Sequence, residues 1–209
     1  MSIGRSLAIR LFGWRLFAAL TALALSVTTA IALQHPDVEG IREIVILSVR
    51  YSLLLFCLAF SATALHELWP TSQSRWLLNN RRYIGLSFAA VHSIHIVALI
   101  IYAVVAPDVY ANNSRLISEV FGVIGYAFVL AMTVTSFSRT KKWLTPARWT
   151  ALHTTGGYCI WAVFMYMFVK RVIAHPLDPI FSIALTMLLS SVALRLQARR
   201  LGWRRFAAS

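Results

Sequence analysis

Histidines inside apolar stretches are the residues of this sequence that could do chemistry. His92 and His95 lie midway along the apolar run 83–106, and His153 lies near the start of the run 149–169. A neutral imidazole offers one ring nitrogen as a metal ligand, while the other can donate a hydrogen bond that fixes the tautomer. Two such residues on facing helices can hold a haem iron within a helix bundle. The alternative for each histidine is an ordinary hydrogen bond between helices.

Six apolar stretches must position these side chains. A helix that crosses a bilayer needs about 20 largely apolar residues. The stretches that reach or approach this length are 11–33, 44–65, 83–106, 116–137, 149–169 and 179–196. They are continuous and do not alternate between apolar and polar residues, which excludes a spanning β-barrel. We therefore expect an all-α polytopic membrane protein in which residues 1–209 form one bundle of six transmembrane helices.

The composition excludes several classes of protein. Hydrophobic residues make up 59% of the chain and charged residues only 13%, about half of the roughly 25% in soluble domains. Two cysteines exclude a secreted scaffold held together by disulfides. The net charge of +13 does not indicate nucleic-acid binding, because the basic residues flank apolar runs and do not form one stripe.

The basic residues predict the orientation. Most Lys and Arg residues lie in the connections on one side of the expected bundle and near both chain ends. By the positive-inside rule this side is cytoplasmic, so both termini are expected in the cytoplasm. The basic excess is explained by topology and contact with anionic lipid. Run 11–33 has a competing interpretation as a cleaved signal peptide, because residues 30–32 (AIA) resemble a cleavage site, but its length favours a retained helix.

Some residues near the histidines would suit a porphyrin. Gly156 and Gly157 follow His153 by about one turn and would let a flat ring approach, although small residues also serve helix packing. Arg50 lies inside run 44–65 and could bind a haem propionate or extend to the lipid headgroups. We find no Gly-rich dinucleotide motif and no phosphate loop, so the chain is not expected to bind NAD(P)H by itself.

Short motifs resemble one family. Segment 81–86, with the sequence RRYIGL, followed by His95, resembles the third helix of the ferric-reductase-like transmembrane domain. Segment 135–153 resembles the loop and fifth helix of that domain's closest form, the haem-binding membrane subunit of the bacterial periplasmic protein-methionine-sulfoxide reductase system. Arg50 lies where that subunit has an arginine on its second helix. The resemblance covers essentially the whole chain.

This resemblance implies electron transfer across a bacterial inner membrane through b-type haem, with one or two haems and with His95 and His153 as ligands. The donor would be a cytoplasmic-side protein or a quinol, and the acceptor would be a periplasmic protein or a larger membrane complex. The chain would then be the membrane component of a multi-subunit oxidoreductase and not a complete enzyme. Nothing in the sequence indicates a flavin site.

One position departs from the family pattern. The family has a second histidine on its fifth helix, 13 residues after the first, and this chain has Tyr166 there. At about 1.5 Å per residue, His95 also lies deeper along its helix than His153. The alternative ligand sets are His95 with Met165, Tyr166 or Met167, His153 with His66, and His92 in place of the missing partner. A haem-poor accessory subunit of a larger membrane complex that keeps this fold is the second functional hypothesis.

Overall fold

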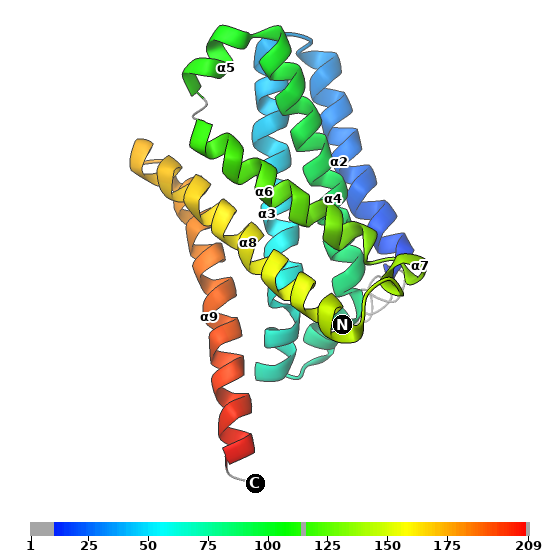
Figure 1. Cartoon of the computed structure of the whole chain (residues 1–209). Coiled ribbons are helices and arrows are strands. Elements are labelled where there is room, and N and C mark those ends of the chain that lie inside the picture. Colours follow the sequence, from blue (N-terminus) through cyan, green and yellow to red (C-terminus); the bar gives the residue numbers. More distant parts are fainter. Residues whose placement is uncertain (1–10, 114–115, 208–209) are drawn as a thin grey trace, which may run out of the picture.

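The computed structural model describes residues 11–113 and 116–207, and the regular structure within them is entirely helical. Figure 1 shows the helices in chain order: α2 (Trp14–Gln34), α3 (Val38–Leu68), α4 (Ser72–Val105), α5 (Pro107–Asn113), α6 (Leu116–Val134), α7 (Ser138–Lys141), α8 (Pro146–Ala174) and α9 (Pro179–Ala207). The prediction of an all-helical chain is confirmed.

Five helices within the described residues are long and apolar enough to cross a bilayer. They are α2, α3, α4, α8 and the part of α9 from Pro179 to Gly202. The expected fourth span, 116–137, corresponds to α6, whose apolar part Ser118–Val134 is shorter than the other five. Large aliphatic side chains such as Leu33 and Ile173 lie exposed on the outside of the bundle. Because aqueous surfaces rarely carry such patches, the chain is a multi-pass membrane protein.

Polar caps make several helices begin before the apolar runs do. The Thr71 side chain accepts a hydrogen bond from the Ser74 backbone N–H at 3.2 Å and caps the N-terminus of α4. Thr145 likewise accepts from the Arg148 N–H, and Pro146 occupies the first turn of α8. A cap satisfies an N–H group that would otherwise lack a partner, so a helix can begin in a polar segment.

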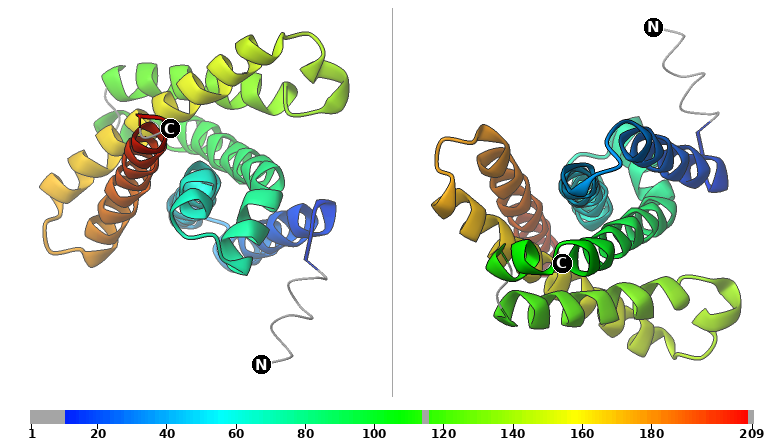
Figure 2. Two further views of the ribbon diagram at one scale, coloured as in Figure 1. Left: turned by 90° about the horizontal axis from the view of Figure 1, so that it is seen from below. Right: turned by 90° about the horizontal axis from the view of Figure 1, so that it is seen from above.

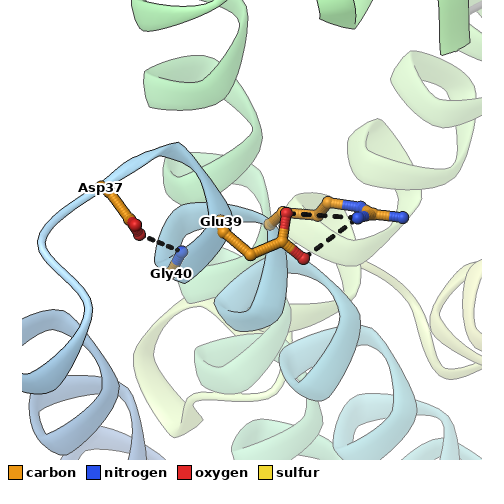
Figure 3. Close-up of polar contacts among 4 residues, drawn as sticks. Asp37, Glu39 and Gly40 are labelled. Carbon is orange, nitrogen blue, oxygen red and sulfur yellow. Dashed lines mark hydrogen bonds and ion pairs between the residues drawn. The ribbon is translucent and has the colours of Figure 1, made fainter.

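The start of α3 shows the same device (Figure 3). The Asp37 carboxylate accepts from the Gly40 N–H at 2.9 Å, and Glu39 pairs with Arg42 at 3.0 Å. A side chain at Gly40 would collide with the backbone carbonyl of His35. The exposed ion pair adds little stability, so the cap and the glycine determine where α3 begins.

A buried amide attaches α2 to α4. The Asn80 side chain is fully buried, accepts from the Gly13 N–H at 2.9 Å and donates to the Trp76 carbonyl at 3.0 Å. Gly13 has φ of 65°, a conformation that residues with a Cβ rarely adopt. The first turn of α2 is therefore held in place by a glycine and by one side chain of α4.

The bundle has an upright part and an oblique part. Helices α2, α3 and α4 stand side by side, and α3 packs most extensively on α4. Helices α6 and α8 pack on each other and run obliquely beside α4, while α9 lies against α3 and α8 (Figure 1; end-on in Figure 2). The first turn of α2 and the last turns of α9 lie toward the end of the bundle opposite α5.

Candidate functional site

Two histidines lie on one face of α4, toward α3. His92 and His95 are three residues apart, so their side chains are neighbours on the helix surface. Their rings stack with centroids 5.2 Å apart and an interplanar angle of 21°. The structure thus places these two imidazoles together within the membrane-spanning part of the bundle.

The α3 backbone fixes the tautomer of His95. Its Nδ1 lies 3.0 Å from the Val45 carbonyl oxygen and 3.4 Å from the Ser48 hydroxyl. A carbonyl oxygen can only accept, and the Ser48 hydroxyl already donates its hydrogen to the same carbonyl at 3.1 Å. We therefore assign the proton to Nδ1, which leaves the Nε2 lone pair available as a ligand.

His92 has the same arrangement one turn further along α3. Its Nδ1 lies 3.2 Å from the Ser52 hydroxyl, which donates its own hydrogen to the Val49 carbonyl at 3.0 Å. A hydroxyl can both donate and accept, so this contact orients the His92 ring without assigning its proton. Among the described residues, no hydrogen bond reaches Nε2 of His92 or His95. His95 therefore has the tautomer that leaves Nε2 for a metal ligand.

The surroundings of His92 are mainly aromatic. Its ring centroid lies 5.4 Å from that of Phe88, 5.9 Å from Tyr126 of α6 and 5.8 Å from Phe164 of α8. The Tyr126 hydroxyl donates to Ser93 at 3.0 Å. The site therefore lies where α3, α4, α6 and α8 meet.

The ligand number favours a macrocycle over a bare metal ion. No group of three or more His, Cys, Asp or Glu side chains that could hold a metal ion is found within 11–113 and 116–207. A structural or catalytic ion such as Zn²⁺ needs three or four protein ligands. Haem iron needs only axial ligands, since the porphyrin supplies the others. One histidine of this pair could supply such a ligand, but the two rings, stacked on one face of α4, cannot bind opposite sides of the same iron.

His153 lies in a separate environment near the start of α8. Its Nε2 lies 3.1 Å from the Thr135 hydroxyl, which donates to the Ala131 carbonyl at 2.7 Å. This contact orients the His153 ring through its Nε2 atom. The ring stacks on Trp149 with centroids 4.2 Å apart, and the Trp149 N–H donates to the Thr135 backbone carbonyl. These contacts involve neither His92 nor His95.

His66 and His153 have different partners. Nδ1 of His66 lies 3.1 Å from the Ser74 hydroxyl, which donates to the Trp69 carbonyl at 2.6 Å. His66 therefore serves the connection between α3 and α4. The contacts of the described residues do not bring it to His153.

Tyr166 and Arg50 also lie apart from the histidine pair. The Tyr166 ring packs on Phe121 of α6 with centroids 5.0 Å apart, and the ammonium of Lys170 lies 5.3 Å from the Tyr166 ring. Phe164 is the α8 residue that contacts His92. The Arg50 guanidinium is half-buried and lies 5.8 Å from the ring of Phe181 on α9.

The two glycines of α8 serve helix packing. A Cβ at Gly156 would lie 2.6 Å from the Met132 sulfur and 3.1 Å from a ring carbon of Phe128, both on α6. A Cβ at Gly157 would lie 3.3 Å from the ring of Phe60 on α3. The alternative of close helix contact therefore accounts for both glycines in this arrangement.

Sequence reasoning missed the serines that orient the pair. Ser48 and Ser52 are both buried and lie one turn apart on α3. The two serines are four residues apart on α3, and the histidines that they contact are three residues apart on α4. This matching spacing is the signal that could have identified the serines. Serine is common in transmembrane helices, so the spacing alone is weak evidence.

The comparisons with known proteins identify one family. The model of the family described as "Ferric reductase like transmembrane component" matches residues 45–168. This segment is more than half of the chain and contains His92, His95, His153, Arg50 and Tyr166. No match was found among curated proteins or among solved structures.

Proposed function

Because the chain belongs to the ferric-reductase-like transmembrane family, we propose that it is a membrane electron-transfer subunit that binds haem b between its helices. The observation that carries this proposal is the hydrogen bonding of the histidine pair. Nδ1 of His95 donates to the Val45 carbonyl of α3, which leaves its Nε2 as a lone-pair donor, and Nδ1 of His92 contacts Ser52 of α3. Such second-sphere contacts orient an axial ligand and increase its basicity.

We assign His95 as the principal axial ligand. Val45 and Ser48 hold its proton at Nδ1 and set the direction of the ring. His92 stacks on it and is the neighbouring ligand candidate, with Ser52 in the same orienting role. When bound, haem supplies the one-electron redox chemistry. Phe88 and Phe164 keep water from the His92 side of the pair.

His153 is assigned to a second position nearer the end of the bundle that holds α7. Its neighbours are Thr135, which contacts Nε2, and Trp149, which stacks on the ring. Haem at His95 alone would give one centre, and a further haem at His153 would give two. Arg50 remains the candidate that would bind a haem propionate. Its guanidinium contacts the ring of Phe181 on α9.

The proposed direction of transfer is supported by the charge distribution, which sets the orientation of the bundle. We propose that α6 is the sixth crossing and that both termini are cytoplasmic in a bacterial inner membrane. A separate protein or a quinol would deliver electrons at this basic face, and a periplasmic protein or a larger complex would accept them. Basic residues near the surface favour an acidic or anionic donor.

A haem-poor accessory subunit is the second candidate. It is favoured by the packing of Gly156 against Met132 and of Gly157 against Phe60, and by Tyr166 at the position of a family histidine. In this alternative the histidines serve only as hydrogen-bonding links between α3 and α4.

Absorption spectroscopy on the purified full chain separates the two candidates. Expressed with added haem precursor, the protein should show a Soret band and, after reduction with dithionite, the α band of b-type haem. A preparation that stays folded and monodisperse but lacks both bands would overturn the haem proposal and support the accessory subunit.

A further inference from the structure

Guanidinium groups from two helices gather near the end of the bundle opposite α5. Arg195 of α9 donates through Nη1 to the Phe60 carbonyl at 2.7 Å and through Nε to the Tyr158 hydroxyl at 3.4 Å. Arg81 of α4 donates through Nη1 to the Thr63 hydroxyl at 3.0 Å. Together with Arg199 of α9, these side chains form what we call the arginine cluster, which is Arg81, Arg195 and Arg199.

Aromatic rings hold two of these groups in place. Cζ of Arg195 lies 4.2 Å from the Phe60 ring centre and 5.2 Å from that of Tyr158. Cζ of Arg199 lies 5.5 Å from the same Tyr158 ring. Cation–π contacts of this kind restrict the guanidinium groups. The cluster is thus preorganised, unlike an arginine that extends freely into the headgroup region.

The cluster carries positive charge without a carboxylate. The only ion pair among the described residues joins Arg42 to Glu39, at the start of α3. Arg81 and Arg195 donate to residues that are three positions apart on α3, Thr63 and Phe60, so two like charges lie on neighbouring turns of the same helix. Each guanidinium has five N–H donors, and the contacts found for Arg195 and Arg81 use few of them. An anion would remove the repulsion and use the remaining donors.

The surface beside the cluster is apolar. Leu196 follows Arg195 directly, and Leu189 precedes Arg195 by six residues on the same helix. Both leucines are 48% exposed. Helix α9 thus presents hydrocarbon to the membrane next to its arginines. An anion that itself carries hydrocarbon chains would satisfy both features.

We propose that the arginine cluster binds the phosphate headgroup of an anionic phospholipid, whose acyl chains lie along the exposed leucines of α9. Arginine binds phosphate oxygens through paired N–H groups, and basic pockets between transmembrane helices on one side of a membrane are suited to such headgroups. The cluster contains none of the assigned axial ligands, so the lipid proposal does not require that haem binds.

Native mass spectrometry of the full chain tests the proposal. The protein is purified in a non-ionic detergent and mixed with equal amounts of phosphatidylglycerol and phosphatidylcholine. We expect the wild-type chain to retain phosphatidylglycerol several-fold more than phosphatidylcholine, and we expect R195Q and R81Q to lose this preference. R195K keeps the charge and should retain part of it. R199Q replaces an exposed side chain of the cluster. This variant therefore tests the lipid preference even if R195Q and R81Q fold poorly.

The control is R200Q, which removes the same charge from an exposed neighbour on α9 that is outside the cluster. Equal retention of the two lipids by the wild-type chain would overturn the proposal, as would an equal loss of preference in R200Q and R199Q. Inorganic phosphate that displaces phosphatidylglycerol at equal concentration would indicate a general phosphate site and also overturn it. If R195Q lost haem but kept its lipid preference, the cluster would be a propionate site and the lipid assignment would be wrong.

Discussion

Nδ1 of His95 and the carbonyl oxygen of Val45 lie 3.0 Å apart, in a hydrogen bond that joins α4 to α3. This contact links two residues that are 50 positions apart in the chain. It decides which nitrogen of His95 can bind iron, because the proton must lie on the side of the carbonyl. The following predictions test this arrangement and its neighbours.

The first prediction concerns the principal ligand. We expect His95→Ala to abolish or sharply reduce haem retention, because it removes the assigned axial nitrogen. The measurement is the Soret absorbance per mole of purified chain. His35→Ala and His175→Ala are matched controls, since both side chains lie exposed where helices end, and neither should change the haem content. Normal haem content in the His95 variant would contradict the assignment.

The second prediction compares the two serines of α3. Ser52→Ala leaves Nδ1 of His92 without its hydrogen-bond partner, and a buried polar atom without a partner costs about 1–3 kcal/mol. Ser48→Ala should cost less, because the Val45 carbonyl still accepts from His95. Thermal unfolding in one detergent measures the difference. Equal stability of the two variants would show that Ser52 does not hold His92.

The third prediction concerns Tyr166. This ring contacts Phe121 and Lys170 and not the histidine pair, so Tyr166→His should leave the haem spectrum unchanged. The new imidazole would lose the packing on Phe121 and lack a defined partner, which should lower stability by about 1–3 kcal/mol. A rise in haem stoichiometry, or a shift to a low-spin spectrum, would instead show that position 166 reaches a haem cavity.

The fourth prediction concerns the electron donor. The sequence contains no recognisable dinucleotide-binding motif, so the purified chain should not oxidise NADPH at a useful rate. Haem held by the chain should still be reduced by dithionite. Stopped-flow absorbance with each reductant is the measurement. Rapid oxidation of NADPH by the rigorously purified chain would contradict the need for a separate donor.

The fifth prediction concerns the anchor of α2. Gly13→Ala places a Cβ on a residue with φ of 65°, which costs roughly 1–2 kcal/mol for an L-residue. The variant should unfold at a lower temperature than the wild-type chain. Gly202→Ala is the control, because a Cβ there would meet no neighbouring atom and alanine favours a helix. Equal loss of stability in both would show that backbone strain at Gly13 is not the cause.

Much of the fold follows from local sequence. Runs of about 20 apolar residues predict membrane helices because their backbone groups must be satisfied within each segment. The runs therefore located α2, α3, α4, α8 and α9. The caps at Asp37, Thr71 and Thr145 then extend three of these helices into polar segments. The family also followed from short local motifs, and the match to residues 45–168 agrees with it.

The sequence by itself identified His92, His95 and His153 as candidate functional residues, because an imidazole inside an apolar run is costly without a partner. Only the tertiary structure decided how they are oriented. Helix packing sets the rotation of each helix about its axis, which brings Ser52 to His92, turns Tyr166 toward Phe121, and leaves His153 with Thr135. These contacts join residues far apart in the chain, and side-chain packing between helices, rather than any local pattern, determines them.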